Sequence, residues 1–320
     1  MTETPTPRLQ HFPIAWFAMI MGLGGLTLAW NRAEALLGLP LALSPYLLVL
    51  TTLLFALLGL AYALKVIKYR AAAAMEWNHP VKMSFLPTFS IALIILSIGW
   101  LPVSESYSRL LWTLGTVLHL LLTLHIMTQW IHQTKFEIVH LNPAWFIPVV
   151  GNILVPLAGV QHAPAEVSWF FFSIGIVFWP VLLASIFYRV IFHGSLPERL
   201  LPTLFILIAP PAVGFLSYLR LTGEVDAFAR ILYFSGLFFT LLLLSQAAWF
   251  MRIKFFLSWW AYSFPLAAIT IATLAMYHHS GTPLFLVLSG VLLGVTSAVI
   301  AGLFVRTAIA VARREICLQE

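Results

Sequence analysis

Ten long apolar runs follow one another along this chain, and none of them contains an Asp, Glu, Lys or Arg residue. A helix needs about 20 predominantly apolar residues to cross the hydrocarbon core of a bilayer, and each run is close to that length. The runs lack the alternating pattern of short strands that is typical of a membrane β-barrel, so helices are the expected solution for backbone in lipid. We therefore predict an all-α polytopic membrane protein whose ten transmembrane helices cover Phe12–Trp30, Leu43–Leu64, Met83–Val103, Leu110–Ile131, Leu141–Val160, Val167–Tyr188, Leu200–Leu219, Ile231–Phe250, Phe255–Tyr277 and Pro283–Val305.

Composition and charge placement predict one membrane domain and its orientation. The chain of 320 residues is 61% hydrophobic and 9% charged, whereas about 25% of the residues of a soluble protein are charged. We expect residues 1–320 to form a single ten-helix domain with tails at residues 1–11 and 306–320. An even number of spans puts both tails on one side, and that side carries thirteen of the 17 Lys and Arg residues. Because cytoplasmic loops are enriched in Lys and Arg, we predict a multi-pass protein of the cell (inner or plasma) membrane with both termini cytoplasmic.

Interior prolines recur in the odd-numbered runs, spaced by about 60 residues, which is the length of one helical hairpin. Proline removes a backbone donor and kinks a helix, and loosened backbone in lipid is tolerated only where protein or water satisfies it. We therefore predict five helical hairpins, with an inner ring of kinked odd helices around a central pore and an outer ring of even helices. The alternative is that membrane helices simply tolerate proline, and Pro180 in the sixth run breaks the pattern. The prolines assigned to the kinked, pore-lining helices are Pro13, Pro87, Pro148, Pro156, Pro210, Pro211 and Pro265.

The stretch Ser258–Tyr277 combines a proline with one large ring on a face of small residues. Phe264 is followed at once by Pro265, which clashes with the carbonyl of Ala261 and is expected to kink or loosen the helix. Along the same helical face, small side chains recur at steps of three and four residues. We predict that Phe264 projects into a narrow bore with a small wall formed by Ala261, Ala268 and Ala272. The alternative is ordinary packing, because small residues also let membrane helices approach closely.

The side chains that several other functions need are missing from the runs. An ion-coupled transporter usually keeps an ionisable residue within the membrane, and the candidates here are His119 and His125 of the fourth run. We expect both to be structural, because the fourth helix belongs to the outer ring, away from the bore. The single cysteine, Cys317, excludes a disulfide within the chain and a Cys-x-x-Cys site. No metal-ligand cluster, nucleophile triad or phosphate-binding glycine loop is found, so we expect no metal, no cofactor and no enzymatic activity. The basic residues lie in short loops, which argues against a nucleic-acid partner.

Short motifs carry a resemblance to a known family. With the first run, Phe12–Trp30, they occur in collinear order over essentially the whole chain. They are Trp259–Ala268 (WWAYSFPLAA), Asn78–Phe85 (NHPVKMSF), Asn142–Asn152 (NPAWFIPVVGN) and Ala209–Tyr218 (APPAVGFLSY). In these stretches the chain resembles the tellurite-resistance/dicarboxylate transporter family, which includes the bacterial TehA proteins and the plant slow-type anion channels.

This resemblance implies a homotrimer in which each ten-helix subunit has its own pore. In the family a phenylalanine on the ninth helix blocks the pore, and the matching position here is Phe264. Pro265 follows it, as in the plant channels, whereas bacterial members often have glycine there. We therefore expect passive transport of small inorganic anions, such as chloride or nitrate, across the lipid bilayer. The alternatives are a secondary transporter for C4-dicarboxylates or sulfite and an exporter that confers tellurite resistance.

Overall fold

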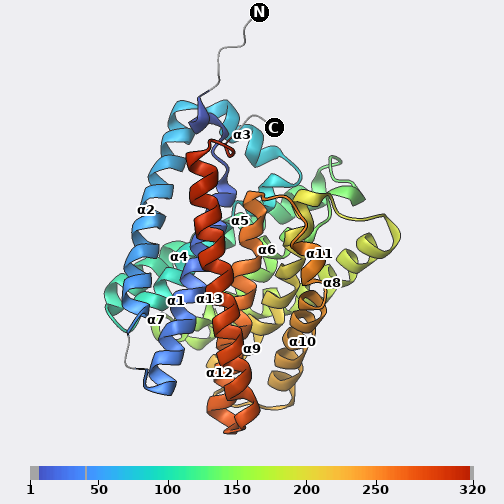
Figure 1. Cartoon of the computed structure of the whole chain (residues 1–320). Coiled ribbons are helices and arrows are strands. Elements are labelled where there is room, and N and C mark those ends of the chain that lie inside the picture. Colours follow the sequence, from blue (N-terminus) through green and yellow to red (C-terminus); the bar gives the residue numbers. More distant parts are fainter. Residues whose placement is uncertain (1–6, 40–41, 318–320) are drawn as a thin grey trace, which may run out of the picture.

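Ten helical spans form one bundle in the computed structural model, which describes residues 7–39 and 42–317 (Figure 1). Within these residues the structure consists of helices, turns and irregular segments, without a strand. Each span is long and apolar enough to cross a bilayer. The predicted all-α fold with ten transmembrane helices is therefore confirmed. Numbered in chain order, the spans are Ile14–Leu37, Ser44–Lys68, Lys82–Trp100, Glu105–His132, Pro143–His162, Ala165–Phe192, Glu198–Thr222, Ala227–Leu244, Leu257–Ser280 and Pro283–Ala312.

The even-numbered spans are continuous α-helices. Their starts have the expected chemistry, because Ser104 and Asp226 accept backbone N–H groups of the first turn in two of them. Two others carry a proline in the first turn, where its missing N–H would have no helical partner. These helices are α2 (Ser44–Lys68), α5 (Glu105–His132), α8 (Ala165–Phe192), α10 (Ala227–Leu244) and α13 (Pro283–Ala312).

The odd-numbered spans change helix type along their length. Each begins as a 3₁₀ helix, with three residues per turn, and continues as an α-helix. In spans one, three, seven and nine the change runs from η2 (Ile14–Trp16) to α1 (Phe17–Leu37), from η3 (Lys82–Phe85) to α4 (Thr88–Trp100), from η7 (Glu198–Ile208) to α9 (Ala209–Thr222), and from η8 (Leu257–Tyr262) to α12 (Ser263–Ser280). Span five alternates twice, through η5 (Pro143–Trp145), α6 (Phe146–Val150), η6 (Gly151–Leu154) and α7 (Pro156–His162).

Prolines lie close to these changes of helix type. Pro87 directly precedes α4, and Pro210 and Pro211 lie in the first turn of α9. Proline is tolerated there because its ring fits the first turn and its missing N–H is not needed. Near Pro265, where the sequence predicts a kinked or loosened helix, the structure has a change of helix type. Pro265 lies in the first turn of α12, and Ala261 belongs to the preceding 3₁₀ segment.

Burial alternates from span to span. In the odd-numbered spans 72% to 83% of the most apolar stretch is buried within the protein, compared with 17% to 44% in the even-numbered spans. The α-helical parts contact one another in the order α1, α4, α7, α9, α12 and back to α1. The 3₁₀ segments follow the same order, from η2 through η3, η5, η7 and η8 back to η2. Each odd-numbered span also packs against the even-numbered span that follows it.

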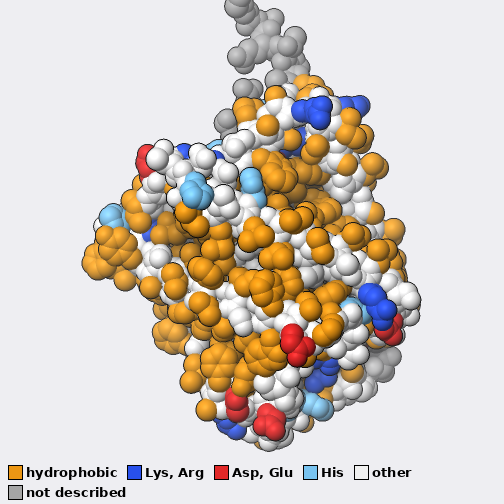
Figure 2. All heavy atoms as spheres, turned by 180° about the vertical axis from the view of Figure 1, so that it is seen from behind, with side chains coloured by type: hydrophobic (Ala, Val, Ile, Leu, Met, Phe, Trp, Pro, Cys, Tyr) orange, Lys and Arg blue, Asp and Glu red, His pale blue; other side chains and the backbone are white. Residues whose placement is uncertain are grey.

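The outside of the bundle is an apolar belt with charged ends. Figure 2 shows hydrophobic side chains over the middle of one face, with Lys, Arg, Asp and Glu side chains toward its two ends. On α2, for example, Leu53, Leu57 and Leu60 are 65%, 61% and 61% exposed. An apolar belt of this kind suits the hydrocarbon core of a bilayer.

The ends of the chain differ in detail from the predicted tails. The predicted tail 306–320 begins inside α13, which continues to Ala312, and the predicted tail 1–11 includes the 3₁₀ helix η1 (Arg8–His11). Residues 1–6 and 318–320 of these tails lie outside the described residues. The described chain begins and ends at the same end of the bundle (Figure 1). One short helix near that end, α3 (Arg70–Asn78), had no signal among the apolar runs. The predicted eighth run, Ile231–Phe250, is divided between α10 and a second short helix, α11 (Ala247–Phe250).

A buried ion pair fastens α2 and α3 to the start of span one. Lys65 Nζ lies 2.7 Å from Glu76 Oε2, and the two side chains are 4% and 5% exposed. The N–H of Ile14 donates to Glu76 Oε1 at 2.7 Å. Lys65 Nζ donates to the carbonyl oxygen of Phe12 at 2.8 Å. The pair therefore satisfies backbone groups just ahead of α1, where no helix satisfies them.

Candidate functional site

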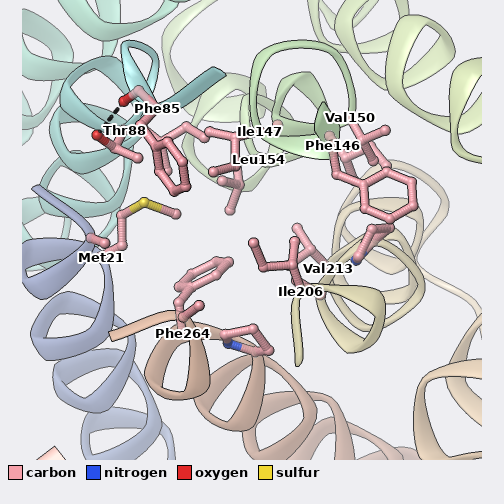
Figure 3. Close-up of a pocket in the computed structure, with 18 of the residues that line it drawn as sticks. Met21, Phe85, Thr88, Phe146, Ile147, Val150, Leu154, Ile206, Val213 and Phe264 are labelled. Carbon is pink, nitrogen blue, oxygen red and sulfur yellow. Dashed lines mark hydrogen bonds between the residues drawn. The ribbon is translucent and has the colours of Figure 1, made fainter. Parts of the chain in front are cut away.

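A cavity of about 70 Å³ lies inside the bundle where the 3₁₀ segments give way to the α-helices. A cavity needs roughly 10–15 Å³ to hold one water molecule, so this one has room for a small solute. All five odd-numbered spans contribute to its wall, and every lining residue lies on one of them. In Figure 3 their side chains surround a common open space. The lining residues are Ala18 and Met21 of span one; Phe85, Thr88 and Ile91 of span three; Phe146, Ile147, Val150, Gly151, Ile153 and Leu154 of span five; Ile206, Ala209, Pro210 and Val213 of span seven; and Trp260, Ala261, Phe264 and Pro265 of span nine.

The wall of this cavity is almost entirely apolar. Its lining residues carry no charge, and Thr88 alone among them has a hydroxyl group, which donates to the carbonyl oxygen of Phe85 at 2.6 Å (Figure 3). The indole N–H of Trp260 is also occupied, because it donates to Thr307 Oγ1 at 3.0 Å. An ion in this cavity would meet no opposite charge and would give up much of its water. Within the described residues, no three His, Cys, Asp or Glu side chains are grouped to hold a metal ion.

Phe264 lies at the edge of the cavity, with its ring directed toward the open space (Figure 3). It belongs to α12, which approaches α1 closely where α1 has glycines. A Cβ atom at Gly25 would lie 3.3 Å from Phe264 Cδ2 and 2.9 Å from the Cβ of Ala267. A Cβ atom at Gly22 would collide with Ser263 Oγ. These glycines therefore bring α12 against α1 and leave the space that the Phe264 ring uses.

The structure brings some of the predicted residues to the cavity and leaves others outside it. Phe264, Pro265, Ala261 and Pro210 line it. Two predicted wall residues lie further along α12 in the apolar core, where they are 2% and 0% exposed, namely Ala268 and Ala272. The remaining predicted prolines belong to the odd-numbered spans or their starts but are not among the lining residues; they are Pro13, Pro87, Pro148, Pro156 and Pro211.

Sequence reasoning missed most of the apolar wall. Phe85 and Thr88 flank Pro87, so the neighbours of interior prolines were a usable signal. Met21 of span one has no proline beside it. The glycine-rich sequence that follows Met21 was the available sign, since glycines on a membrane helix let another helix approach.

His119 is not where sequence reasoning put it. It belongs to α5, an even-numbered span, yet its side chain is 0% exposed. Its Nε2 atom would lie 2.9 Å from a Cβ atom at Gly151, which is a lining residue. His125 on the same helix is exposed. The expectation that the fourth helix keeps both histidines away from the central cavity is therefore wrong for His119, which reaches the back of the cavity wall.

Comparison with known proteins identifies the family. A family model described as a voltage-dependent anion channel, SLAC1, matches residues 11–308. This chain belongs to the SLAC1 family. The membership confirms the resemblance carried by the four motifs, because the plant slow-type channels and a TehA homolog are among the relatives. Its relatives include proteins named as S-type anion channels, as uncharacterized transporters and as a tellurite resistance protein.

Relatives of this SLAC1-family chain come from plants, bacteria and archaea. The S-type anion channel SLAH3 of Arabidopsis thaliana is 28% identical over 95% of this chain. The tellurite resistance protein TehA homolog of Haemophilus influenzae is 29% identical over 88% of this chain and 88% of its own length. The uncharacterized transporter MJ0762 of Methanocaldococcus jannaschii is 26% identical over 84% of this chain and 86% of its own length. The match spans only 49% of SLAH3 and 59% of the related channel SLAH2, so this chain covers about half of the plant proteins.

Proposed function

We propose that this protein is a passive anion channel, with the odd-numbered spans as an inner ring around a pore and the even-numbered spans as an outer ring. The observation that carries the proposal is the central cavity, whose lining residues all come from odd-numbered spans. The succession of contacts that runs from α1 through the other odd-numbered spans and back to α1 supports a closed wall. Anions as the cargo are supported by relatives that are named S-type anion channels.

In this proposal Phe264 is the gate of the pore. One aromatic ring can close a narrow apolar constriction both by its bulk and by excluding water. Fully burying a phenylalanine side chain is worth about 1.5–3 kcal/mol, and the partly buried Phe264 falls at the lower end of this range. Because about 1.4 kcal/mol corresponds to a factor of ten, the ring would lower the open fraction roughly tenfold.

The apolar wall sets the order in which ions would pass. Since no lining residue is charged, the protein does little to offset the cost of removing water from an ion. Anions that hold water weakly, such as nitrate, would therefore pass more readily than chloride. Doubly charged anions, including C4-dicarboxylates, would pass least.

The membrane setting and the assembly are part of the same proposal. We infer that the protein lies in the cell (inner or plasma) membrane with both termini cytoplasmic, as the distribution of Lys and Arg predicts. We also infer a homotrimer, in keeping with the family resemblance. The exposed apolar faces of the even-numbered spans are available both to lipid and to neighbouring subunits. The mass of the purified protein in detergent, measured by light scattering, tests the trimer.

The channel and its gate are tested together by voltage clamp, in cells that express wild type, Phe264→Ala or Phe285→Ala. Phe285 is the matched control, because its side chain is also partly buried but lies on α13 against Tyr233, outside the cavity lining. We expect nitrate and chloride currents to rise roughly tenfold in Phe264→Ala. The Phe285→Ala currents should match those of wild type.

Two results would contradict this proposal. If Phe264→Ala reaches the cell surface but stays as silent as wild type, Phe264 is a packing residue and not a gate. If no variant carries current but a labelled dicarboxylate is taken up in a saturable, proton-dependent way, the protein is a secondary transporter. Saturable export of tellurite without current would likewise favour an exporter.

A further inference from the structure

The imidazole of His119 lies directly behind the cavity wall, and one of its nitrogens has no partner. Nδ1 lies 2.9 Å from Ser90 Oγ, whereas the buried Nε2 atom makes no hydrogen bond. The space that a Cβ atom at Gly151 would fill is bordered by Nε2 at 2.9 Å and by Ile91 Cδ1 at 2.8 Å. Gly151 and Ile91 both line the cavity. The unpartnered nitrogen is therefore separated from the cavity by a residue that has no side chain.

The hydrogen bonds of Ser90 indicate which nitrogen can take up a proton. Ser90 Oγ donates to the carbonyl oxygen of Pro87 at 2.9 Å. A carbonyl can only accept, so the single hydroxyl hydrogen is used there, and Nδ1 of His119 donates to Ser90 Oγ. Nε2 is then a bare acceptor. Asn152, the residue after Gly151, has a second buried acceptor without a partner, its Oδ1 atom. The amide nitrogen of Asn152 donates to the carbonyl oxygen of Val149 at 2.8 Å, which fixes the orientation of the amide group.

We propose that His119 Nε2 is a proton-binding site that is coupled to anion binding in the cavity, an inference that rests on the proposed anion channel. An isolated imidazolium in an apolar interior is costly, and so is an unpaired anion in an apolar cavity. Because Gly151 and Ile91 are the lining residues next to His119, the two charges would lie close enough for each to offset the cost of the other. The proton and the anion therefore favour each other's binding, and by linkage they do so by the same factor.

One other titratable side chain faces α5 from the described elements around His119, that of His162, whose Nδ1 atom is also buried without a hydrogen bond; its ring lies against Trp112, which does not line the cavity. The described segments α4, α6 and η6, which pack against α5, carry no charged or titratable side chain. On α7 the final residue, His162, lies 2.8 Å from Ser108 Oγ of α5 through Nε2. The remaining titratable side chains of α5 are all exposed; they are Glu105, Tyr107, Arg109, His125 and His132.

Nitrate flux into liposomes that contain the purified full-length chain tests the proposal. The Phe264→Ala substitution is present throughout to keep the pore open. We expect the flux to rise at least about fivefold as the pH falls from about 8 to about 4.5, a range extended to the acidic side because burial disfavours the charged form of an imidazole. His119→Asn keeps a donor toward Ser90 but has no acceptor at Nε2, so the pH response should disappear. His125→Asn, which changes the exposed histidine on the same helix, should keep it.

Four results would overturn the proton site. They are a flux that does not depend on pH in the Phe264→Ala background, a pH response that survives in folded His119→Asn, a response that is lost equally in His125→Asn, and an unchanged response in Ser90→Ala. The Ser90→Ala variant removes the bond that orients the imidazole, and it decides the matter if His119→Asn does not fold. A pH-independent flux leaves the proposed channel intact. The absence of any flux at any pH removes both the channel and the proton site.

Discussion

Glu76→Gln tests how much the buried ion pair holds the bundle together. The substitution keeps the shape of the side chain but leaves the ammonium group of Lys65 buried, with the carbonyl oxygen of Phe12 as its remaining partner. Removing one partner of a buried pair costs about 3–5 kcal/mol. At roughly 2 °C per kcal/mol for a large domain, the midpoint of thermal unfolding in detergent should fall by roughly 6–10 °C.

The control and the double variant separate the ion pair from other effects. Glu105→Gln breaks an exposed pair with Arg109, whose two side chains are 58% and 61% exposed, and should leave the midpoint unchanged. Lys65→Met with Glu76→Gln leaves no buried charge, so its loss should be smaller than the sum of the two single losses by about 1–3 kcal/mol. Tryptophan fluorescence during heating measures all four variants. Equal shifts in Glu76→Gln and Glu105→Gln, or additive losses in the double variant, would refute this reasoning.

The Glu76→Gln substitution should also affect the cavity. Glu76 holds the N–H of Ile14, and α1 begins shortly after it with Ala18 and Met21 in the cavity wall. A looser start of α1 should raise the basal anion current of Glu76→Gln above that of Glu105→Gln, measured by voltage clamp. Identical currents in the two variants would confine the ion pair to a role in stability.

Two further predictions concern the C-terminus and the contact between α1 and α12. Cys317 is the one cysteine of the sequence, and burial raises the pKa of its thiol. A maleimide that cannot cross membranes should therefore react with this thiol slowly at neutral pH and faster as the pH rises. It should react only after the cells are permeabilised, and labelling of intact cells would contradict the proposed orientation. Gly22→Ala puts a methyl group against Ser263 and should cost about 1–3 kcal/mol in thermal unfolding. Gly59→Ala, whose Cβ atom would meet nothing within 4 Å, is its control, and equal losses would contradict the close contact.

The number and type of the spans could be predicted because long uncharged runs have one common solution in lipid. The change of helix type within the odd-numbered spans could not. In η7 (Glu198–Ile208) nearly every residue after the first turn is apolar, so the pattern does not separate 3.0 from 3.6 residues per turn. Pro210 and Pro211 mark a break in this span, but a proline does not say which helix type precedes it.

The sequence predicted which helix face contributes to the candidate site, but not how far the site extends along the helix. Phe264 stood out against its small neighbours, and it does line the cavity. Ala268 and Ala272 follow the same periodicity but lie beyond the cavity, because a sequence reveals the face of a helix and not the depth of a hollow along it. His119 was predicted to lie away from the cavity because of the helix to which it belongs. Its approach to the cavity depends on Gly151 of another span, and no pattern in one sequence pairs two such residues.

The length of the cavity wall depends on the helix type of its segments. A 3₁₀ helix rises about 2.0 Å per residue and an α-helix about 1.5 Å. The 11 residues of η7 therefore extend over about 22 Å, and would extend over only about 16.5 Å if they rewound as an α-helix. Rewinding would also turn Ile206, which now lines the cavity, to a new direction. A change of helix type in such a span would therefore alter both the length and the lining of the wall.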